Sequence, residues 1–240
     1  MEVWELIRPV ITSWKGQHRS VSGHEGRYEM REIVGAILYQ ARVGRQWRYL
    51  PHYFPPYTAV YYFGKWRDDG TDQVIHNLLR WQVRESRGRR EDPSAIVMDT
   101  QTVHASVNAP KATAGLDPGK KSRGRKPGIT TDILGLLIAV IVVPASVHDN
   151  AIGITLLDQV AADNPSVTKG WVNAGFKNAV IDHGAALGID IEVVQRDPHT
   201  KDFAPAPKRW IVEQTLCATR RSVCIPGSAG RNSEGGSWAR

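Results

Sequence analysis

The spacing of apolar residues changes near residue 90, and this change constrains the fold more than any other feature of the sequence. Before it, apolar side chains recur every three or four positions, which places them on one face of a helix. Beyond it, they gather in short β-branched runs typical of strands, separated by stretches with helical spacing. We therefore expect an α+β protein, with a helical bundle followed by a mixed α/β sheet.

Four helices are expected in the first region. Pro9 interrupts the apolar stripe of the first, because a proline inside a helix removes a backbone hydrogen bond. Thr58 is expected to cap the third helix, and the fourth is expected over about 72–84. A charged, glycine-containing connection at 84–93 then separates a helical domain, residues 1–90, from the strand-containing domain that follows.

The second region has the predicted order of three strands, helix, strand, helix, strand and helix. These elements are expected at 95–98, 129–133, 136–143, 149–162, 170–172, 177–187 and 189–194, with the last helix beginning near Lys208. The interval between the first two strands carries a basic cluster without apolar periodicity, which predicts a solvated loop. The cluster consists of Lys120, Lys121, Arg123, Arg125 and Lys126.

The pattern changes again after residue 216. Apolar periodicity vanishes, and Pro226 and several glycines would break any helix. The last helix is therefore expected to be cut short, and residues 217–240 are expected to form an irregular, disordered tail. We interpret this tail as a frameshift product, because its sequence looks like translation in the wrong reading frame. A natural flexible tail is the alternative, and the encoding DNA would distinguish the two.

The charge balance favours a polyanionic partner. Lys and Arg outnumber Asp and Glu by 31 to 24, for a net charge of +7 and a pI near 9.5. A merely basic soluble protein is the alternative. The start of the chain does not resemble a secretory signal, and the longest apolar run, 133–145, is too short for a membrane helix. Cys217 and Cys224 lack zinc-ligand spacing, so we expect no structural metal and a cytoplasmic setting.

Asp99 stands at the end of the first predicted strand. A buried carboxylate costs free energy unless something pairs with it. It could cap a turn or accept a hydrogen bond from Thr100, or it could be a metal ligand. Phosphodiester cleavage uses two Mg²⁺ ions, and Mg²⁺ prefers a small number of carboxylate oxygens in proteins.

Several motifs, in order along the chain, resemble one known family. They are WRYLP at 47–51, DTQTV at 99–103, GKKSRGRK at 119–126, GLLIAV at 135–140, PASVHD at 144–149 and RWIVE at 209–213. Together they resemble the DDE transposases of insertion sequences, in particular the insertion sequence five group. The resemblance spans nearly everything up to about residue 216.

The resemblance implies a ribonuclease-H-like catalytic domain at 91–216 and a helix-turn-helix-like DNA-binding domain at 1–90. It implies a bacterial, nucleoid-associated protein that is not bound to a membrane. The implied partners are double-stranded DNA, namely the terminal inverted repeats and the target, and other copies of the chain in a homo-oligomer. Strand cleavage and strand transfer with two Mg²⁺ or Mn²⁺ ions are the implied chemistry. A catalytically inactive end-binding protein or repressor is the main alternative, and a stand-alone nuclease of the same fold is another.

The family's catalytic residues carry over one by one. Asp99 matches the first catalytic Asp, and Glu213 matches the catalytic Glu, with Arg209 four positions before it. The second catalytic Asp is replaced by Asn173. The implied metal ligands are therefore Asp99 and Glu213. An amide brings no negative charge, so the resemblance implies impaired cleavage by this chain. Asp182 belongs to the following predicted helix and is not expected to substitute.

Contacts with DNA are expected from two further places besides Arg209. Lys65 and Arg67 lie on the helix that would be offered to the major groove, whereas Phe63 and Trp66 are expected in the core. The basic cluster at 120–126 is expected to contact phosphates, with a merely solvated face as the alternative. His104 and His148 have no carboxylate at ligand spacing and are not expected to take part in chemistry.

Overall fold

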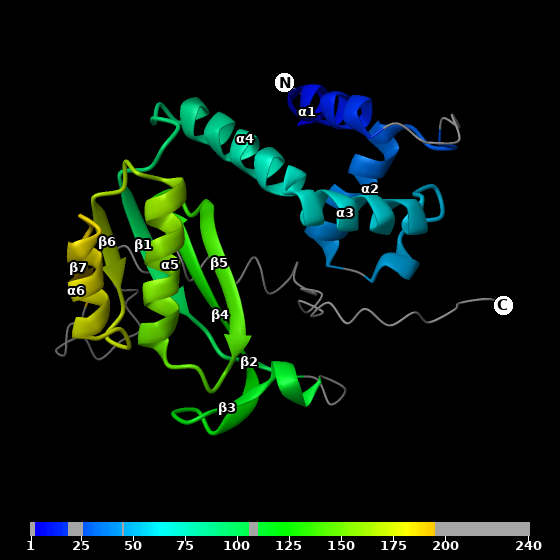
Figure 1. Ribbon diagram of the computed structural model, residues 1–240. Helices are drawn as coiled ribbons and strands as arrows, with labels where there is room; N and C mark the ends of the chain where they lie inside the picture. The colour runs from blue at the N-terminus through cyan, green and yellow to red at the C-terminus, as the bar shows by residue number, and fades with distance from the viewer. Residues whose placement is uncertain (1–2, 19–25, 45, 106–109, 195–240) are drawn as a thin grey trace, which may run out of the picture.

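The computed structural model describes residues 3–18, 26–44, 46–105 and 110–194. The predicted last helix, with Arg209 and Glu213, and the tail at 217–240 lie outside the described residues. Within them, the structure is α+β, with a helical part followed by a mixed sheet, which confirms the predicted fold class (Figure 1).

The helical part contains the four predicted helices, joined by a short 3₁₀ turn. They are α1 (Val3–Gln17), α2 (Met30–Val43), α3 (Pro56–Asp69) and α4 (Thr71–Ser86), with η1 (Trp47–Tyr49) between α2 and α3. Their apolar faces share a core in which Ile7, Ile11 and Ile33 are fully buried. Trp66 of α3 is buried in the same core, as its helical spacing predicted.

Two details of these helices differ from the prediction. α1 runs unbroken through Pro9, because Ile7 and Ile11 on either side are both buried and their packing outweighs one lost hydrogen bond. α3 begins at Pro56 rather than after a Thr58 cap. A proline suits the first helical position, since its fixed φ is already helical and its missing N–H would have no partner there.

The second part is built on a mixed sheet. Its strands are β1 (Ala95–Thr100), β2 (Val103–His104), β3 (Gly115–Asp117), β4 (Ser122–Asp132), β5 (Leu137–Pro144), β6 (Lys169–Val172) and β7 (Asp190–Val193). The strand order is β2-β4-β1-β6-β7, with β3 and β5 also paired to β4. β1 runs parallel to β6 and antiparallel to β4, and β6 runs parallel to β7. The 3₁₀ turn η2 (Lys111–Thr113) precedes β3.

The predicted solvated loop is wrong for the second half of the basic cluster. Residues 122–126 are the start of β4, which is 11 residues long. Arg125 pairs with Val103 on one side and Pro144 on the other, so the strand continues well beyond its apolar residues. β3 and β4 form a hairpin that projects from one end of the sheet (Figure 1).

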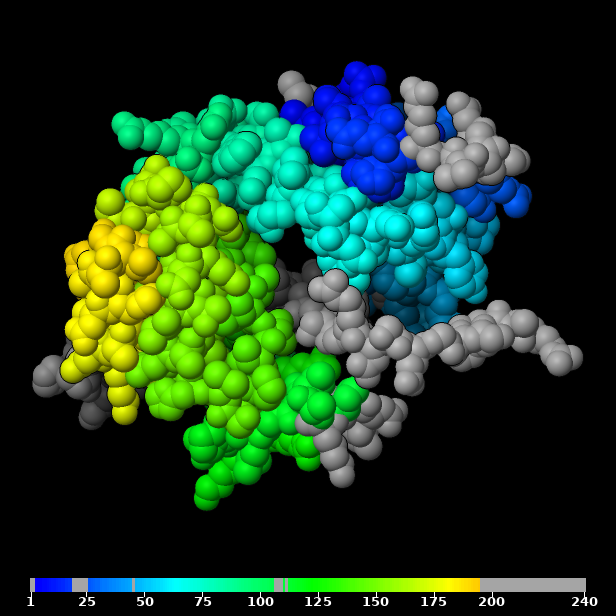
Figure 2. Space-filling view, viewed as in Figure 1, coloured from blue at the N-terminus to red at the C-terminus, as the bar shows by residue number. Residues whose placement is uncertain are grey.

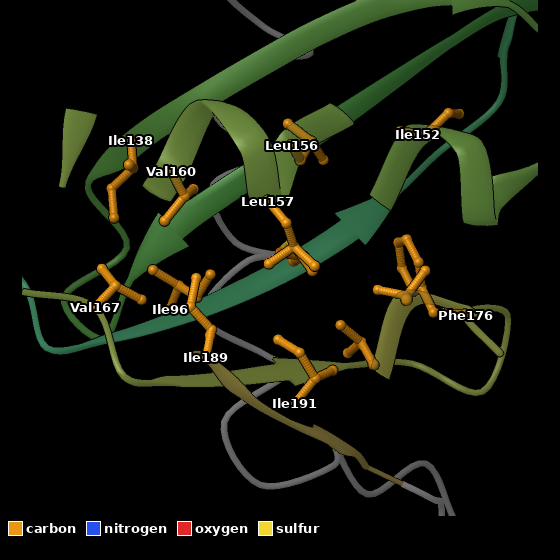
Figure 3. Packing of buried hydrophobic residues seen from close by; sticks show 13 residues of the cluster. Ile96, Ile138, Ile152, Leu156, Leu157, Val160, Val167, Phe176, Ile189 and Ile191 are labelled. Carbon is orange, nitrogen blue, oxygen red and sulfur yellow. The ribbon is translucent and has the colours of Figure 1, made fainter. Parts of the chain in front are cut away.

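Two helices pack against the sheet, α5 (Asp149–Asp163) and α6 (Asn178–Ala186). Figure 3 shows Leu157 and Val160 of α5 gathered with Ile96 of β1 and Ile191 of β7 in one apolar cluster. α5 approaches β4 closely at Gly128, where an added Cβ would lie 2.3 Å from the Ile152 side chain. This packing brings the first turn of α5 to the end of the sheet.

The two parts are joined through α4, which lies along the top of the molecule in Figure 2. The His76 ring hydrogen-bonds the backbone oxygen of Leu137 at 2.9 Å. Near the end of α4, Arg84 forms a buried ion pair with Asp132, the last residue of β4. Arg84 Nε also donates to the backbone oxygen of Arg90 at 2.7 Å. No helix in the described ranges is both long enough and apolar enough to cross a bilayer.

Candidate functional site

Two predicted site residues meet where β1 and β6 end. Because these neighbouring strands are parallel, with Val97 opposite Trp171, their carboxyl ends lie at the same edge of the sheet. Asp99 is near the end of β1 and Asn173 follows β6 directly. The Asn173 Nδ2 donates to Asp99 Oδ1 at 2.5 Å. Residues 74 positions apart in sequence are thus in direct contact, as a shared site requires.

Asp99 is buried, with 6% of its surface exposed. Its Oδ1 also accepts the backbone N–H of Thr100 at 2.9 Å. The hydrogen bond from Thr100 that the sequence suggested is therefore present. It does not exclude a role in binding, because a carboxylate oxygen has more than one lone pair.

The orientation of the Asn173 amide is fixed by its partners. Its Oδ1 accepts the backbone N–H of Gly175 at 2.7 Å, while its Nδ2 faces the carboxylate of Asp99. The carbonyl oxygen, the only atom of this side chain that can ligate a cation, therefore points away from Asp99. An aspartate in the same pose would bring two carboxylates together, which requires a proton or a cation between them.

The loop that follows Asn173 is anchored on α5. Phe176 is buried and packs against Gly153, where a Cβ would come within 2.8 Å of its ring. The backbone N–H of Lys177 donates to Asn150 Oδ1 at 2.8 Å. The positions of Asn173 and of the first turn of α5 are thus coupled.

The carboxylate of Asp149, to which the sequence motifs assign no role, also lies at this end of the sheet. An ideal Cβ at Gly175 would lie 2.8 Å from Asn173 Oδ1 and 3.1 Å from Asp149 Oδ2. The two oxygens therefore converge on a space that only a glycine leaves open. Asp149 was part of the PASVHD motif, but only the packing of α5 on the sheet shows that it lies beside Asn173.

Lys126 is buried beneath this site. Its Nζ donates to Asp149 Oδ1 at 2.9 Å and to the backbone oxygen of Val147 at 3.1 Å, and it lies 3.9 Å from Asp117 Oδ2. The predicted contact of Lys126 with DNA phosphates does not fit this burial, because the charge is already paired inside the protein.

Asp117 is held strongly in its charged form. The hydroxyl of Thr102 and the backbone N–H of Lys120, followed by that of Gly119, donate to its carboxylate and lower its pKa to about 2. Nearby Lys126 acts in the same direction. These contacts fix the β3–β4 hairpin next to the end of β1.

The remaining predicted DNA contacts differ in exposure. Lys120, Lys121 and Arg123 are exposed at the hairpin, whereas Arg125 is half-buried and donates to the Thr113 hydroxyl at 2.7 Å.

On α3, both predicted DNA contacts are exposed. Arg67 lies 2.9 Å from Asp68, and Lys65 Nζ lies 6.0 Å from the ring centre of Tyr61. Phe63 is half-buried and its ring centre lies 5.4 Å from that of Trp47.

The donor set at the sheet end fits a divalent cation such as Mg²⁺ in chemistry. Asp99, Asn173 and Asp149 all offer oxygen ligands, which Mg²⁺ prefers. In the part of the chain that the structure describes, no three His, Cys, Asp or Glu side chains are close enough together to hold a metal ion. Further ligands would have to come from elsewhere, and the predicted Glu213 lies outside the described residues.

Comparison with known families gives two matches. A model described as a transposase of the IS4/5 family matches residues 2–76, and a model described as a transposase DDE domain matches residues 90–216. A comparison with curated protein sequences finds no match. The two matches cover the helical part and the sheet in turn.

Proposed function

We propose that this chain, which belongs to the DDE-type transposases of the IS4/5 group, acts on the ends of an insertion element. Residues 1–90 would bind the terminal inverted repeats, and residues 91–216 would cleave and join DNA strands. The protein would act as a homo-oligomer that brings two ends and the target together. Cleavage by this chain would be impaired relative to a copy with aspartate at position 173.

The contact between Asp99 and Asn173 carries the proposal. Two divalent cations, when bound, would activate the attacking oxygen and stabilise the leaving oxygen of the phosphodiester. Asp99 and Glu213 would hold them, and Asn173 stands where the family has its second aspartate. The burial of Asp99 excludes water around the carboxylate, which strengthens its attraction for a cation.

The same contact supports impaired cleavage. Asn173 lacks a negative charge, and its carbonyl oxygen already accepts the N–H of Gly175. To ligate a cation beside Asp99 the amide would have to rotate and give up both of its hydrogen bonds. A second candidate function, binding of transposon ends without cleavage, is favoured by this orientation because nothing in it disturbs DNA binding.

The exposed basic residues support a path for DNA at this end of the sheet. Lys120, Lys121 and Arg123 lie on the hairpin beyond the end of β1, and their charges are available for phosphates. Lys65 and Arg67 on α3 would contact the DNA from the helical part, and Arg209 is proposed as a further contact. Arg125 and Lys126 are left out of this interface because both are engaged inside the protein.

Cleavage of labelled transposon-end DNA tests the catalytic part of the proposal. With Mg²⁺ or Mn²⁺ present, Asn173→Asp should cleave at least about tenfold faster than the wild type, because it restores a charged ligand. Asn178→Asp, the same change on an exposed residue of α6, is the control and should cleave like the wild type. Equal turnover by the wild type and Asn173→Asp would refute the impairment.

The salt dependence of end binding tests the DNA path. Replacing Lys120, Lys121 and Arg123 by Gln should reduce the slope of log K against log salt by up to roughly 0.9 per lost phosphate contact. A triple Gln variant of Arg87, Arg89 and Arg90, exposed at the other end of the sheet, is the matched control. An unchanged slope in the hairpin variant, or an equal loss in the control, would contradict this path.

A further inference from the structure

We propose that Asp149 supplies this chain's cation site with the negative charge that Asn173 does not provide, and that Lys126 positions it there. This inference rests on the proposed function, since it concerns the same site. It assigns a role to the first residue of α5, which the sequence resemblance left without one.

The first argument is the position of the Asp149 carboxylate. Its Oδ2 and the Oδ1 of Asn173 lie 3.1 and 2.8 Å from one point, the Cβ position of residue 175. A side chain at 175 would fill that space, and glycine keeps it open. Asn173 in turn contacts Asp99. Asn173 therefore has Asp99 on its Nδ2 side and the Asp149 carboxylate on its Oδ1 side, at the end of the sheet.

The second argument is how Asp149 is held. Lys126 Nζ donates to Oδ1 at 2.9 Å and is itself fixed by the backbone oxygen of Val147. Since Lys126 is buried, with 7% of its surface exposed, this contact has few alternative geometries. Oδ1 is thus engaged, while Oδ2 is the oxygen turned toward Asn173 and Gly175.

The third argument is the charge balance of the sheet end. The buried Lys126 Nζ lies 2.9 Å from Asp149 and 3.9 Å from Asp117, so these two carboxylates share one ammonium group. One ammonium group does not balance the formal charge of two carboxylates. A divalent cation matches the remaining charge, which the neutral amide of Asn173 cannot provide.

The position of Asp149 also has a purely structural consequence, because a carboxylate in the first turn stabilises a helix. Stability alone therefore cannot report on the proposed role. Cation binding can, since a helix-stabilising carboxylate elsewhere would leave it unchanged.

The test measures Mn²⁺ binding to the full chain, without DNA, from the electron paramagnetic resonance signal of free Mn²⁺. Asp149→Asn keeps the shape of the side chain and an acceptor for Lys126, and should weaken Mn²⁺ binding at least about tenfold. Asp182→Asn, which removes an exposed carboxylate from α6, is the matched control and should bind Mn²⁺ as the wild type does. The same pair of changes is repeated in the Asn173→Asp background, where binding should be tighter throughout.

A second variant avoids any loss of charge. Gly175→Ala places a methyl group between Asn173 Oδ1 and Asp149 Oδ2 and should also weaken Mn²⁺ binding. Circular dichroism confirms that each variant is folded. Mn²⁺ affinity that is unchanged by Asp149→Asn in both backgrounds would overturn the inference, as would the absence of Mn²⁺ binding in both.

Binding of transposon ends in metal-free buffer separates this inference from the proposed function. The wild type and the Asp182→Asn control should bind DNA ends alike, because the exposed basic residues are the same in both. Failure of the wild type to bind ends would refute the proposed function, whereas the Mn²⁺ titrations would still decide the role of Asp149.

Discussion

Two buried aspartates at opposite ends of one sheet have side-chain partners of different charge. β1 and β4 are antiparallel, so Asp132 pairs with Ile96 at one end, while Asp99 pairs with Ile129 toward the other. Asp132 is fully buried, forms an ion pair with Arg84 and accepts the backbone N–H groups of Leu134 and Leu136. Asp99 is nearly as buried, yet Asn173, the side chain across from it, is a neutral amide.

The difference separates a structural carboxylate from the one that we propose to bind a cation. A buried charge needs compensation, and at Asp132 the chain provides it from its own arginine. At Asp99 the described donors to Oδ1 are the amide of Asn173 and the backbone N–H of Thr100, which are both neutral. The first end therefore holds an arginine–aspartate pair, whereas the second is where our proposal places the cation.

The largest expected effect is at the end with the arginine–aspartate pair. Arg84→Met should lower the free energy of unfolding by about 3–5 kcal/mol, because it leaves the Asp132 charge buried without its partner. Urea unfolding measures the loss, with Arg87→Met, an exposed neighbour, as the control. A loss below about 1 kcal/mol would break the comparison, since Asp132 would then need no cation.

An intermediate effect is expected at the other end. In EDTA, Asn173→Asp should be about 1–3 kcal/mol less stable than the wild type, because a hydrogen bond is replaced by two facing carboxylates. Mg²⁺ should restore the stability of Asn173→Asp, and it should stabilise the wild type less. Chemical denaturation with and without Mg²⁺ measures this, and Asn178→Asp again controls for the added charge. If Asn173→Asp is as stable as the wild type in EDTA, then carboxylates at positions 99 and 173 do not repel each other as this prediction requires.

The smallest effect sharpens the comparison at the hairpin. Asp117→Asn should lower the free energy of unfolding by roughly 1 kcal/mol near neutral pH, because the hydrogen bonds from Thr102 and the backbone favour the ionised carboxylate.

The sign of its pH dependence follows from the lowered pKa. A carboxyl whose folded pKa is depressed from 3.8 to about 2 contributes stability above its unfolded pKa, and that contribution is lost as the pH falls toward 2. The variant should therefore lose less stability than the wild type between these values, which unfolding curves across the acid range would show. An equal loss of unfolding free energy in the variant and the wild type over this acid range would contradict the prediction.

The sequence predicted the elements with strong local patterns. The helix expected at 149–162 is α5 (Asp149–Asp163), and the strand expected at 170–172 is β6 (Lys169–Val172). β2 and β3 were missed, because two or three residues are too few to show a period. β4 was expected to begin at Ile129, but pairing with strands on both sides extends it to Ser122.

The site was predictable only where a motif pointed to it. Asp99 and Asn173 were found from the resemblance, and the parallel pairing of β1 and β6 explains why they meet. The burial of Lys126 could not be read from its basic neighbours, because it depends on Asp149 and Asp117 arriving from elsewhere in the chain. The same applies to Asp149, whose place is set by the packing of α5.

The continuity of α4 has a consequence for how the two parts cooperate. One end of the helix contributes Ile75 and Leu79 to the core of the helical part, while the other is held on the sheet by Arg84. Both contacts are made by one continuous helix, so the spacing and the rotation between the proposed DNA-contacting face of α3 and the sheet depend on the number of residues between them. Inserting a single residue between Leu79 and Arg84 would turn one part against the other by roughly 100°. The length of α4 would then determine how far from the recognised sequence the DNA is presented to Asp99.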